Sequence, residues 1–328
     1  MKEVVTILEA INHALDYSLK VNKNVVLLGQ DIGPNGGVFR VTEGLQQKYG
    51  EERVIDTPLA ENMIAGITVG MAVSGLVPIA EFQFMGFIYP AVDQILSHAS
   101  RMRNRTRGRL TCGAVFRAPY CGGIGAPEHH SESTEAIFSH IPGIRVVIPS
   151  SPARAYGLLL AAIENPDPVV FLEPKKIYRA VKQEVNLDGK ALPLDKAFVL
   201  TEGSDLTLVS WGATLIEAQK AVTDLAKIDI SVELIDLATI KPLDMDTIIK
   251  SVMKTGRCVI AHEAAKTCGV GAEIAAVLAD KCIEYLQGPI KRVTGYDTVM
   301  PYYQLEEHYL PCKDRISNEI INLLEPVV

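Results

Sequence analysis

Short, mostly apolar runs alternate along the chain with longer segments whose apolar residues recur at three- and four-residue spacing. Runs such as 24–30 (NVVLLGQ) and 76–84 (LVPIAEFQF) are typical of strands buried on both faces of a sheet. Longer segments such as 152–163 are typical of helices with one buried face. Because the two kinds of segment alternate throughout, the pattern predicts an α/β protein with a doubly wound parallel sheet in each half.

The same pattern divides the chain into two domains. In the first half, strands are expected at 24–30, 53–56, 76–84, 110–117, 145–149 and 169–173, and helices at 1–19, 41–49, 89–107 and 152–163. In the second half, strands at 206–211, 230–235, 258–261 and 290–294 alternate with helices at 214–225, 243–254, 271–282 and 314–324. The periodicity fades over 182–197, where charges, glycine and proline collect. We therefore expect domains at 1–181 and 198–328, joined by a linker at 182–197.

Residues 56–75 (DTPLAENMIAGITVGMAVSG) place the carboxylate of Glu61 directly before a helix of very small residues, and 62–80 contain no charged side chain. The interior glycines Gly66 and Gly70 cost about 1 kcal/mol each relative to alanine, a loss that is tolerated where another element comes very close. A Ser-Gly pair and a proline interrupt the apolar stretch, so a buried helix and strand explain it better than a membrane span. Glu61 is then either a charge at a helix start or a working acid.

Composition narrows the range of functions. With 39 acidic and 32 basic residues the net charge is −7, which gives no support for nucleic-acid binding. None of the six cysteines forms a Cys-x-x-Cys pair, so neither a zinc site nor a disulfide framework is indicated, and a reducing, cytoplasmic setting is expected. The acidic amino-terminal segment does not have the pattern of a signal or transit peptide.

The glycine loops at 121–127 and 269–271 lack the phosphate-binding and dinucleotide-binding fingerprints, so a nicotinamide-dependent dehydrogenase is weakly supported. His129 and His130 follow the first loop, but adjacent histidines point different ways and no His-Glu-x-x-His is present, which argues against a metal hydrolase. A histidine beside a glycine loop fits better as a proton donor or carboxylate binder. A serine hydrolase lacks its Gly-x-Ser-x-Gly elbow.

Several longer motifs share one resemblance. DTPLAE with its small-residue helix, AEFQFMGFIYPAVDQI, FRAPYCGGIGAPEHHSES, PGIRVVIPSSP, DPVVFLEPKKIYR, SWGATLIEAQKA and IDLATIKPLD follow one another along essentially the whole chain. In this order and spacing they resemble the β subunit of the decarboxylating component of 2-oxoacid dehydrogenases. The resemblance implies a transketolase-like fold, with a pyrimidine-binding domain followed by a C-terminal domain, and thiamine diphosphate as cofactor.

The resemblance also implies roles for five residues. Glu61 is the catalytic glutamate that hydrogen-bonds the aminopyrimidine ring and so promotes loss of the thiazolium proton; its uncharged flanks are expected to supply a dry pocket. His130 is the histidine that meets the substrate carboxylate or serves acyl transfer. Leu59, Gln83 and Phe87 line the pyrimidine pocket, although ordinary core packing also explains Leu59 and Phe87.

A monovalent cation, K⁺ in this family, is implied on backbone carbonyls at Cys112, Ala114, Val115, Ala162, Asn165 and Asp167. Asn165 stands where the family usually has aspartate, which weakens this expectation. Two further departures are Gln30, in place of a glutamate on a proposed proton path between paired active sites, and Ala238, in place of an arginine on a surface.

Half of the cofactor site is missing from the sequence. The family holds the diphosphate and Mg²⁺ with Gly-Asp-Gly and a later Asn-Asn, and the chain contains neither. The resemblance therefore implies an α subunit that supplies the Mg²⁺ site, in an α2β2 heterotetramer. It also implies docking to the lipoyl acyltransferase core, with Asp297 and the Val328 carboxylate as candidate contacts.

The substrate is expected to be a small 2-oxo acid. The HHSES loop favours a pyruvate-type subunit, while branched-chain and acetoin dehydrogenases stay open as alternatives. A non-catalytic scaffold subunit is the alternative of another class, and the joint presence of Glu61, Gln83 and His130 argues against it.

Overall fold

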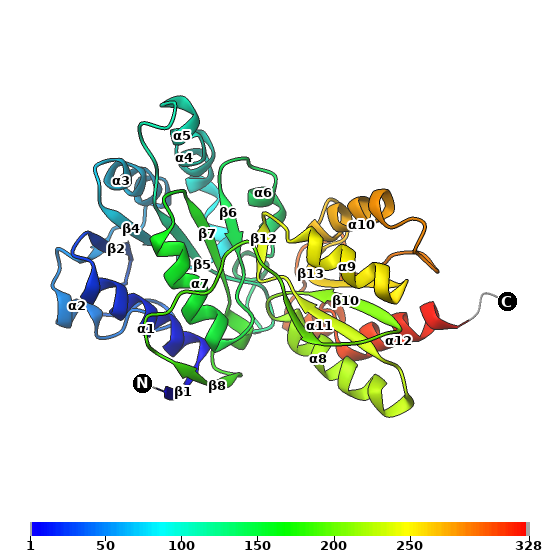
Figure 1. Ribbon diagram of the computed structural model, residues 1–328. Coiled ribbons are helices and arrows are strands. Elements are labelled where there is room, and N and C mark those ends of the chain that lie inside the picture. Colours follow the sequence, from blue (N-terminus) through cyan, green and yellow to red (C-terminus); the bar gives the residue numbers. More distant parts are fainter. Residues whose placement is uncertain (1, 326–328) are drawn as a thin grey trace. The chain divides into compact units, whose positions relative to one another are not determined.

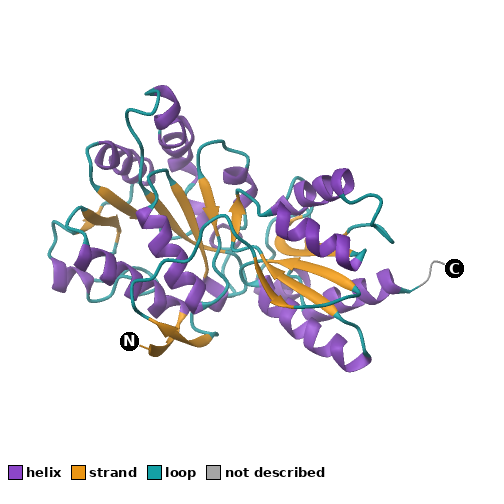
Figure 2. Ribbon diagram, viewed as in Figure 1, coloured by secondary structure: helices purple, strands orange, loops and turns teal. Residues whose placement is uncertain are grey.

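The computed structural model describes residues 2–325 and shows two compact α/β units (Figures 1 and 2). Unit 1 runs to Tyr120 and resumes from Ile137 to Leu194, whereas unit 2 takes Cys121–Ala136 and everything described from Asp195 onward. The expected α/β class with two doubly wound halves is confirmed. The glycine loop, expected within the first domain, packs with unit 2.

Unit 1 is built on parallel strands in the order β6-β7-β5-β4-β2-β3, with a separate antiparallel pair, β1-β8. Its strands are β1 (Lys2–Thr6), β2 (Val25–Gln30), β3 (Val54–Thr57), β4 (Val77–Glu81), β5 (Val115–Tyr120), β6 (Arg145–Val147), β7 (Val169–Pro174) and β8 (Lys182–Asn186). Strands β5 and β7 are buried at every position, and this includes one charged residue in each, Arg117 of β5 and Glu173 of β7.

Helices cover this sheet, and α1 packs along α7 (Figure 1). The helices are α1 (Ile7–Val21), α2 (Leu45–Tyr49), α3 (Glu61–Val73), α4 (Val92–Ser97), α5 (Met102–Arg105), α7 (Pro152–Glu164) and, across the boundary between the units, α6 (Glu135–Ser139). Single 3₁₀ turns occur at η1 (Met85–Phe87), η2 (Tyr89–Ala91), η3 (Ala99–Arg101), η4 (Glu128–His130) and η5 (Lys175–Ile177).

Two helices expected in unit 1 were wrong in their extent. Residues 2–6 form strand β1 rather than helix, because β-branched residues precede Thr6, whose side chain forms a capping box with Glu9 and begins α1. The helix expected at 89–107 is broken into η2, α4, η3 and α5. The expected linker begins with β8, which pairs with β1 from Lys182 to Asn186, so only the later part of 182–197 is irregular.

Unit 2 has the strand order β14-β13-β10-β11-β9, with β9 antiparallel to β11 and the other neighbours parallel. The strands are β9 (Phe198–Thr201), β10 (Leu206–Ser210), β11 (Val232–Asp236), β12 (Thr239–Lys241), β13 (Cys258–Ala265) and β14 (Lys291–Gly295). The helices are α8 (Thr214–Leu225), α9 (Met245–Thr255), α10 (Val270–Lys281), α11 (Tyr303–Tyr309) and α12 (Lys313–Leu324), with the 3₁₀ turn η6 (Ala226–Ile228).

Two helix layers enclose the unit 2 sheet. Helices α8 and α12 pack together on one face and α9 and α10 on the other (Figure 1). Leucine, valine and isoleucine side chains from β10, β11, β13, α8 and α12 form one buried core. Ala238, expected at a surface, is fully buried after β11 and has a positive φ of 50°.

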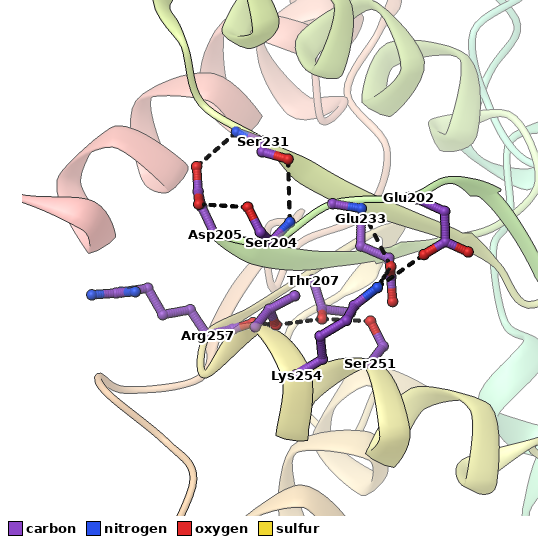
Figure 3. A network of polar contacts seen from close by, with 11 residues as sticks. Glu202, Ser204, Asp205, Thr207, Ser231, Glu233, Ser251, Lys254 and Arg257 are labelled. Atoms are coloured by element: carbon purple, nitrogen blue, oxygen red, sulfur yellow. Dashed lines mark hydrogen bonds and ion pairs between the residues drawn. The ribbon is translucent and has the colours of Figure 1, made fainter.

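A polar network fastens α9 to the amino ends of β10 and β11 (Figure 3). The Lys254 ammonium group donates to Glu202 at 2.9 Å and to the nearly buried Glu233. Beneath it, the hydroxyl of Thr207 lies 2.7 Å from that of Ser251. The polar atoms at this end of the sheet are thus used for structure, because a buried polar group is costly unless it is hydrogen-bonded.

Helix α3 is shorter than a membrane-spanning segment and is followed by strand β4, as its sequence predicts. Among residues 2–325, no helix has the length and apolar character needed to cross a membrane. The glycine face of α3 is only partly covered: a Cβ added to Gly66 would touch Gln94 at 3.6 Å, whereas one on Gly70 would meet nothing within 4 Å.

A buried charge cluster joins the three central strands of unit 1. Arg117 of β5 is 1% exposed and donates to Glu81 of β4 at 3.0 Å and to Glu173 of β7 at 2.6 Å. The Tyr178 hydroxyl donates to the second oxygen of Glu173. Two carboxylates and one hydroxyl thus surround a single guanidinium, while its Nη2 has no partner within the described residues.

The titration properties of the cluster follow from this burial. Burial raises the pKa of Glu81, even against the attraction of Arg117. Burial alone would lower the pKa of Arg117, but Glu173 and Glu81 raise it above its ordinary value. The arginine supplies the positive charge that both closely spaced buried carboxylates share, and the Tyr178 hydroxyl adds a hydrogen bond to one of them.

We predict that Arg117→Met lowers the free energy of unfolding by about 3–5 kcal/mol near neutral pH, because both carboxylates lose their counter-charge. Without the arginine the pKa of Glu81 rises further in the folded state, so the stability loss grows as pH rises through that pKa and shrinks at about pH 5. Urea unfolding at about pH 5 and about pH 8 measures the difference. The exposed Arg101→Met is the matched control and should change stability by less than about 0.5 kcal/mol; an Arg117→Met penalty that is equal at both pH values would contradict the prediction.

Candidate active site

The carboxyl ends of β2, β3 and β4 bring three polar side chains to one edge of the unit 1 sheet. These strands are neighbours and parallel, in the order β4-β2-β3, so the residues that follow them meet at the same edge. Asp31 follows β2, Glu61 follows β3, and Gln83 follows β4. In open parallel sheets this edge is where ligands bind.

Glu61 is the first residue of α3 and is half-buried. Among residues 2–325 this carboxylate makes no hydrogen bond or ion pair. It is therefore available to a group that lies outside the described chain.

The uncharged flanks of Glu61 do not enclose it. Leu59 is 66% exposed, and Met63 and Ile67 of α3 are 37% and 41% exposed. The expectation that the flanks themselves supply a dry pocket was wrong for the chain on its own, because the apolar side chains point outward. A dry environment for Glu61 requires another surface against this face.

Asp31, which was not among the residues predicted from the sequence, holds the side chain of Gln83. The Gln83 side-chain nitrogen donates to the Asp31 carboxylate at 2.8 Å. Asp31 has a positive φ of 61° and ends the run of buried residues in β2. Its place directly after a buried strand was the available signal, since an acidic residue there lies at the carboxyl edge.

Phe87 belongs to a row of aromatic rings. It meets Phe84 edge-on at 5.5 Å between centroids, Phe84 meets Phe39 at 5.5 Å, and Phe39 meets Tyr178 at 5.4 Å. Tyr178 in turn donates to Glu173 of the Arg117 cluster. A row of edge-on and tilted ring contacts thus connects Phe87 at the sheet edge to the buried charge cluster, in addition to ordinary core contacts.

His130 lies in unit 2, at the end of the 3₁₀ turn η4. Its backbone N–H donates to the Pro127 carbonyl at 2.9 Å, and the Ser131 hydroxyl donates to the Ala126 carbonyl at 3.2 Å. His130 is half-buried, whereas the adjacent His129 is exposed. The turn therefore separates the two histidines into different environments, and no distance between His130 and Glu61 is implied.

The two segments expected to hold a cation lie together in unit 1. A Cβ added to Gly113 would lie 3.0 Å from the Asn165 carbonyl oxygen, so 112–115 and 162–167 are in contact. The carbonyls of Ala114 and Ala162 each accept one backbone hydrogen bond, from Val169 and Asn165. A carbonyl oxygen has two lone pairs, so these contacts leave room for a cation.

The side chains of Asp167 and Cys112, near the expected cation site, have structural roles of their own. Asp167 accepts from Arg103 at 2.8 Å, and burial raises the pKa of Cys112 to about 12, which keeps the thiol neutral. In the described part of the chain, no three His, Cys, Asp or Glu side chains are grouped as metal ligands. The roles of Cys112, Val115 and the other carbonyls stay a prediction.

Asp297 is exposed in unit 2, as a docking residue must be. Its carboxylate accepts from the Thr267 N–H at 2.9 Å and from the Thr267 hydroxyl at 2.7 Å, and these hydrogen bonds lower its pKa. The side chain is therefore ionised and fixed in direction. Val328 lies outside the described residues.

Comparisons with known proteins agree with the two-unit architecture. The chain matches the transketolase pyrimidine-binding domain over residues 3–181 and the transketolase C-terminal domain over 195–316. A solved split-gene transketolase, an inactive beta4 tetramer, has the same fold with a TM-score of 0.79, at 22% identity over 98% of each chain.

Sequence relatives are more specific. The chain is 50% identical to the pyruvate dehydrogenase E1 component subunit beta of Acholeplasma laidlawii over 98% of each sequence. It is 48% identical to that of Mycoplasma genitalium, over 97% of this chain and 98% of the relative, and 47% identical to that of Bacillus subtilis, over 93% and 94%. The chain thus belongs to the family of pyruvate dehydrogenase E1 component beta subunits, built from the two transketolase-type domains.

Proposed function

We propose that the chain is the β subunit of a thiamine-diphosphate-dependent pyruvate dehydrogenase, which decarboxylates pyruvate oxidatively and acylates lipoyl groups on an acyltransferase core. The observation that carries the proposal is the 50% identity to a named β subunit over 98% of both sequences. The unpartnered Glu61 carboxylate at the ligand-binding edge of the sheet supports it.

The residues at this edge fit the pyrimidine half of the cofactor. Glu61 offers a carboxylate without any partner in residues 2–325, Gln83 is held in place by Asp31, and Phe87 presents an aromatic ring. When bound, thiamine diphosphate supplies a nucleophilic carbon for attack on the keto group. Glu61 would hold a proton at its carboxylate, and Gln83 and Phe87 would orient the ring. Leu59, which is 66% exposed in the chain alone, would exclude water from the ring once a second subunit covers it.

His130 is assigned to the substrate. An imidazole can donate a hydrogen bond to a carboxylate or a proton to a developing thiolate or alkoxide. Its loop places it outside the sheet that carries Glu61, so it is suited to the part of the reaction that involves pyruvate and the lipoyl group.

The site requires an α subunit. The chain has no diphosphate or Mg²⁺ motif, and the outward side chains of Leu59, Met63 and Ile67 form an apolar face beside Glu61. An α subunit that covers this face would exclude water from Glu61 and contribute Mg²⁺, and an α2β2 heterotetramer follows from pairing two such halves. The carbonyls at 112–115 and 162–167 would hold K⁺, and Asp297 would contact the acyltransferase core.

The division of the cofactor site between two subunits can be tested with the purified chain. The purified chain alone should bind thiamine diphosphate weakly and show no decarboxylation of pyruvate, 2-oxoisovalerate or acetoin. After copurification with its α subunit it should act best on pyruvate, because the relatives that it matches are pyruvate enzymes. Isothermal titration and a carbon dioxide release assay provide the measurements; robust turnover by the pure chain would refute the split site.

The proposed catalytic role of Glu61 can be tested in the reconstituted enzyme. In the reconstituted enzyme, Glu61→Ala should leave assembly and folding intact, since the carboxylate has no partner in the chain, but lower kcat by roughly 10²–10⁴-fold. Exchange of the thiazolium C2 proton for deuterium, followed by NMR, isolates the step. The control is Glu43→Ala, an exposed carboxylate in the same unit, and normal exchange in Glu61→Ala would remove Glu61 from its assigned role.

A comparison of the two adjacent histidines tests the proposed role of His130. His130→Ala should raise KM for pyruvate and slow reductive acylation of the lipoyl group, while leaving the affinity for thiamine diphosphate within about threefold. His129→Ala, one residue away but exposed, is the matched control and should behave like the unaltered enzyme. Indistinguishable kinetics of the two variants would exclude His130 from the site.

A further inference from the structure

The glycine loop at 121–125 turns two of its backbone N–H groups, those of Gly123 and Gly125, toward one point. Cys121, Gly123 and Gly125 have positive φ values of 73°, 86° and 69°. Residues in the left-handed conformation that alternate with others direct successive N–H groups into a concavity, which is a common way of binding an anion. In this chain the concavity already contains an anion.

That anion is the side chain of Glu306, on α11. Its Oε1 accepts from the Gly123 N–H at 2.6 Å and its Oε2 from the Gly125 N–H at 2.9 Å. Glu306 is only 6% exposed, and among residues 2–325 no lysine, arginine or histidine forms an ion pair with it. Its charge is therefore stabilised by the loop's own N–H groups, and each side holds the other in place.

The fit between the loop and this carboxylate leaves no room for other residues. A Cβ on Gly122 would lie 2.5 Å from the Cε of Met300 and 3.2 Å from the Glu306 carboxylate. At Gly123 and Gly125 the positive φ values strain any other residue. The glycines of this loop, which carry no phosphate-binding fingerprint in the sequence, are thus explained by an internal carboxylate.

Two further contacts fix the ends of the loop. Glu263 of β13 accepts from the Gly122 N–H at 2.6 Å and from the Ser133 hydroxyl at 2.8 Å. Trp211, which directly follows β10 and stacks on His262 at 4.9 Å, donates to Glu135 at 3.4 Å. The turn η4, with His130 at its end, lies in the sequence between these fixed points.

We infer that Glu306 is a positioning residue, whose carboxylate occupies the N–H concavity of the glycine loop and thereby sets the conformation of the turn that carries His130. We call the contact of the Glu306 carboxylate with the Gly123 and Gly125 N–H groups the clamp. The inference that the clamp matters for turnover rests on the proposed function, whereas the existence of the clamp does not. Glu263 performs the same task at the start and end of the loop, so the loop is held by two carboxylates that take no part in the chemistry.

Backbone hydrogen exchange tests the clamp directly on the full chain. In Glu306→Ala the amides of Gly123 and Gly125 should exchange about tenfold faster or more, because each loses a charge-assisted hydrogen bond. The Gly122 amide, which is held by Glu263, should change less. Glu306→Gln retains one acceptor oxygen and should lie between the two, and it serves as the second variant if Glu306→Ala fails to fold.

Chemical rescue separates a positioning carboxylate from a side chain that only fills space. Added formate should enter the vacated concavity of Glu306→Ala and slow amide exchange again, whereas chloride at equal ionic strength should not. In the enzyme reconstituted with its α subunit, formate should restore kcat in parallel with protection. Glu307→Ala, an exposed neighbour on the same helix, is the matched control and should respond to neither.

The outcomes distinguish the clamp from the function. Unchanged exchange at Gly123 and Gly125 in both Glu306 variants, or failure of formate to restore protection, would overturn the clamp whatever the activity. Faster exchange with unaltered turnover would keep the clamp and overturn the role of the loop, and of His130, in the reaction. Faster exchange together with a formate-restored loss of kcat supports both.

Discussion

The buried ion cluster of Arg117 with Glu81 and Glu173 is the constraint on which the rest of unit 1 depends. It links the side chains of three neighbouring strands, so their register fixes where the carboxyl ends fall. The cluster also shapes the turn after β2, because a Cβ on Gly37 would lie 2.8 Å from the Glu81 carboxylate. Gln83 follows Glu81 by two residues, and the aromatic row from Tyr178 leads to Phe87. The ligand-binding edge is therefore set by charges buried beneath it, at the cost of one guanidinium nitrogen without a partner.

Four buried carboxylates of the chain differ from that of Glu61 in their hydrogen-bond partners. Glu81, Glu173, Glu263 and Glu306 are buried, and each accepts hydrogen bonds from an arginine, a tyrosine, a serine or backbone N–H groups. Such groups are structural, because the cost of burying their charge is offset by partners in the same chain. Glu61 differs, since it is half-buried and has no partner in residues 2–325. A carboxylate that is kept at a helix start but left unpartnered is explained by a ligand from outside the chain, which agrees with the family assignment.

The parts that could be predicted from the sequence are those encoded locally. Apolar runs located most strands, and an isolated carboxylate before an uncharged helix located Glu61. Contacts between distant residues could not be predicted: Glu306 lies 183 residues from Gly123, and Arg117 lies 56 from Glu173. The glycine loop shows the limit clearly, because glycines with positive φ have the same sequence pattern whether their N–H groups face a phosphate or an internal glutamate. The amino-terminal strand was missed because its β-branched residues also fit the helical spacing that continues into α1.

The apolar face of α3 could not be interpreted from sequence either, for a physical reason. Burial in the chain's own core and burial in an interface require the same side chains, so spacing alone does not separate them. The structure does: Met63 and Ile67 point outward and a Cβ on Gly70 would meet nothing. Within residues 2–325, no close contact at Gly70 compensates for the ~1 kcal/mol of helix stability that it gives up relative to alanine. A surface from another subunit, packed closely on this face, would explain the glycine, the outward apolar side chains and the dry environment that Glu61 needs by one and the same contact.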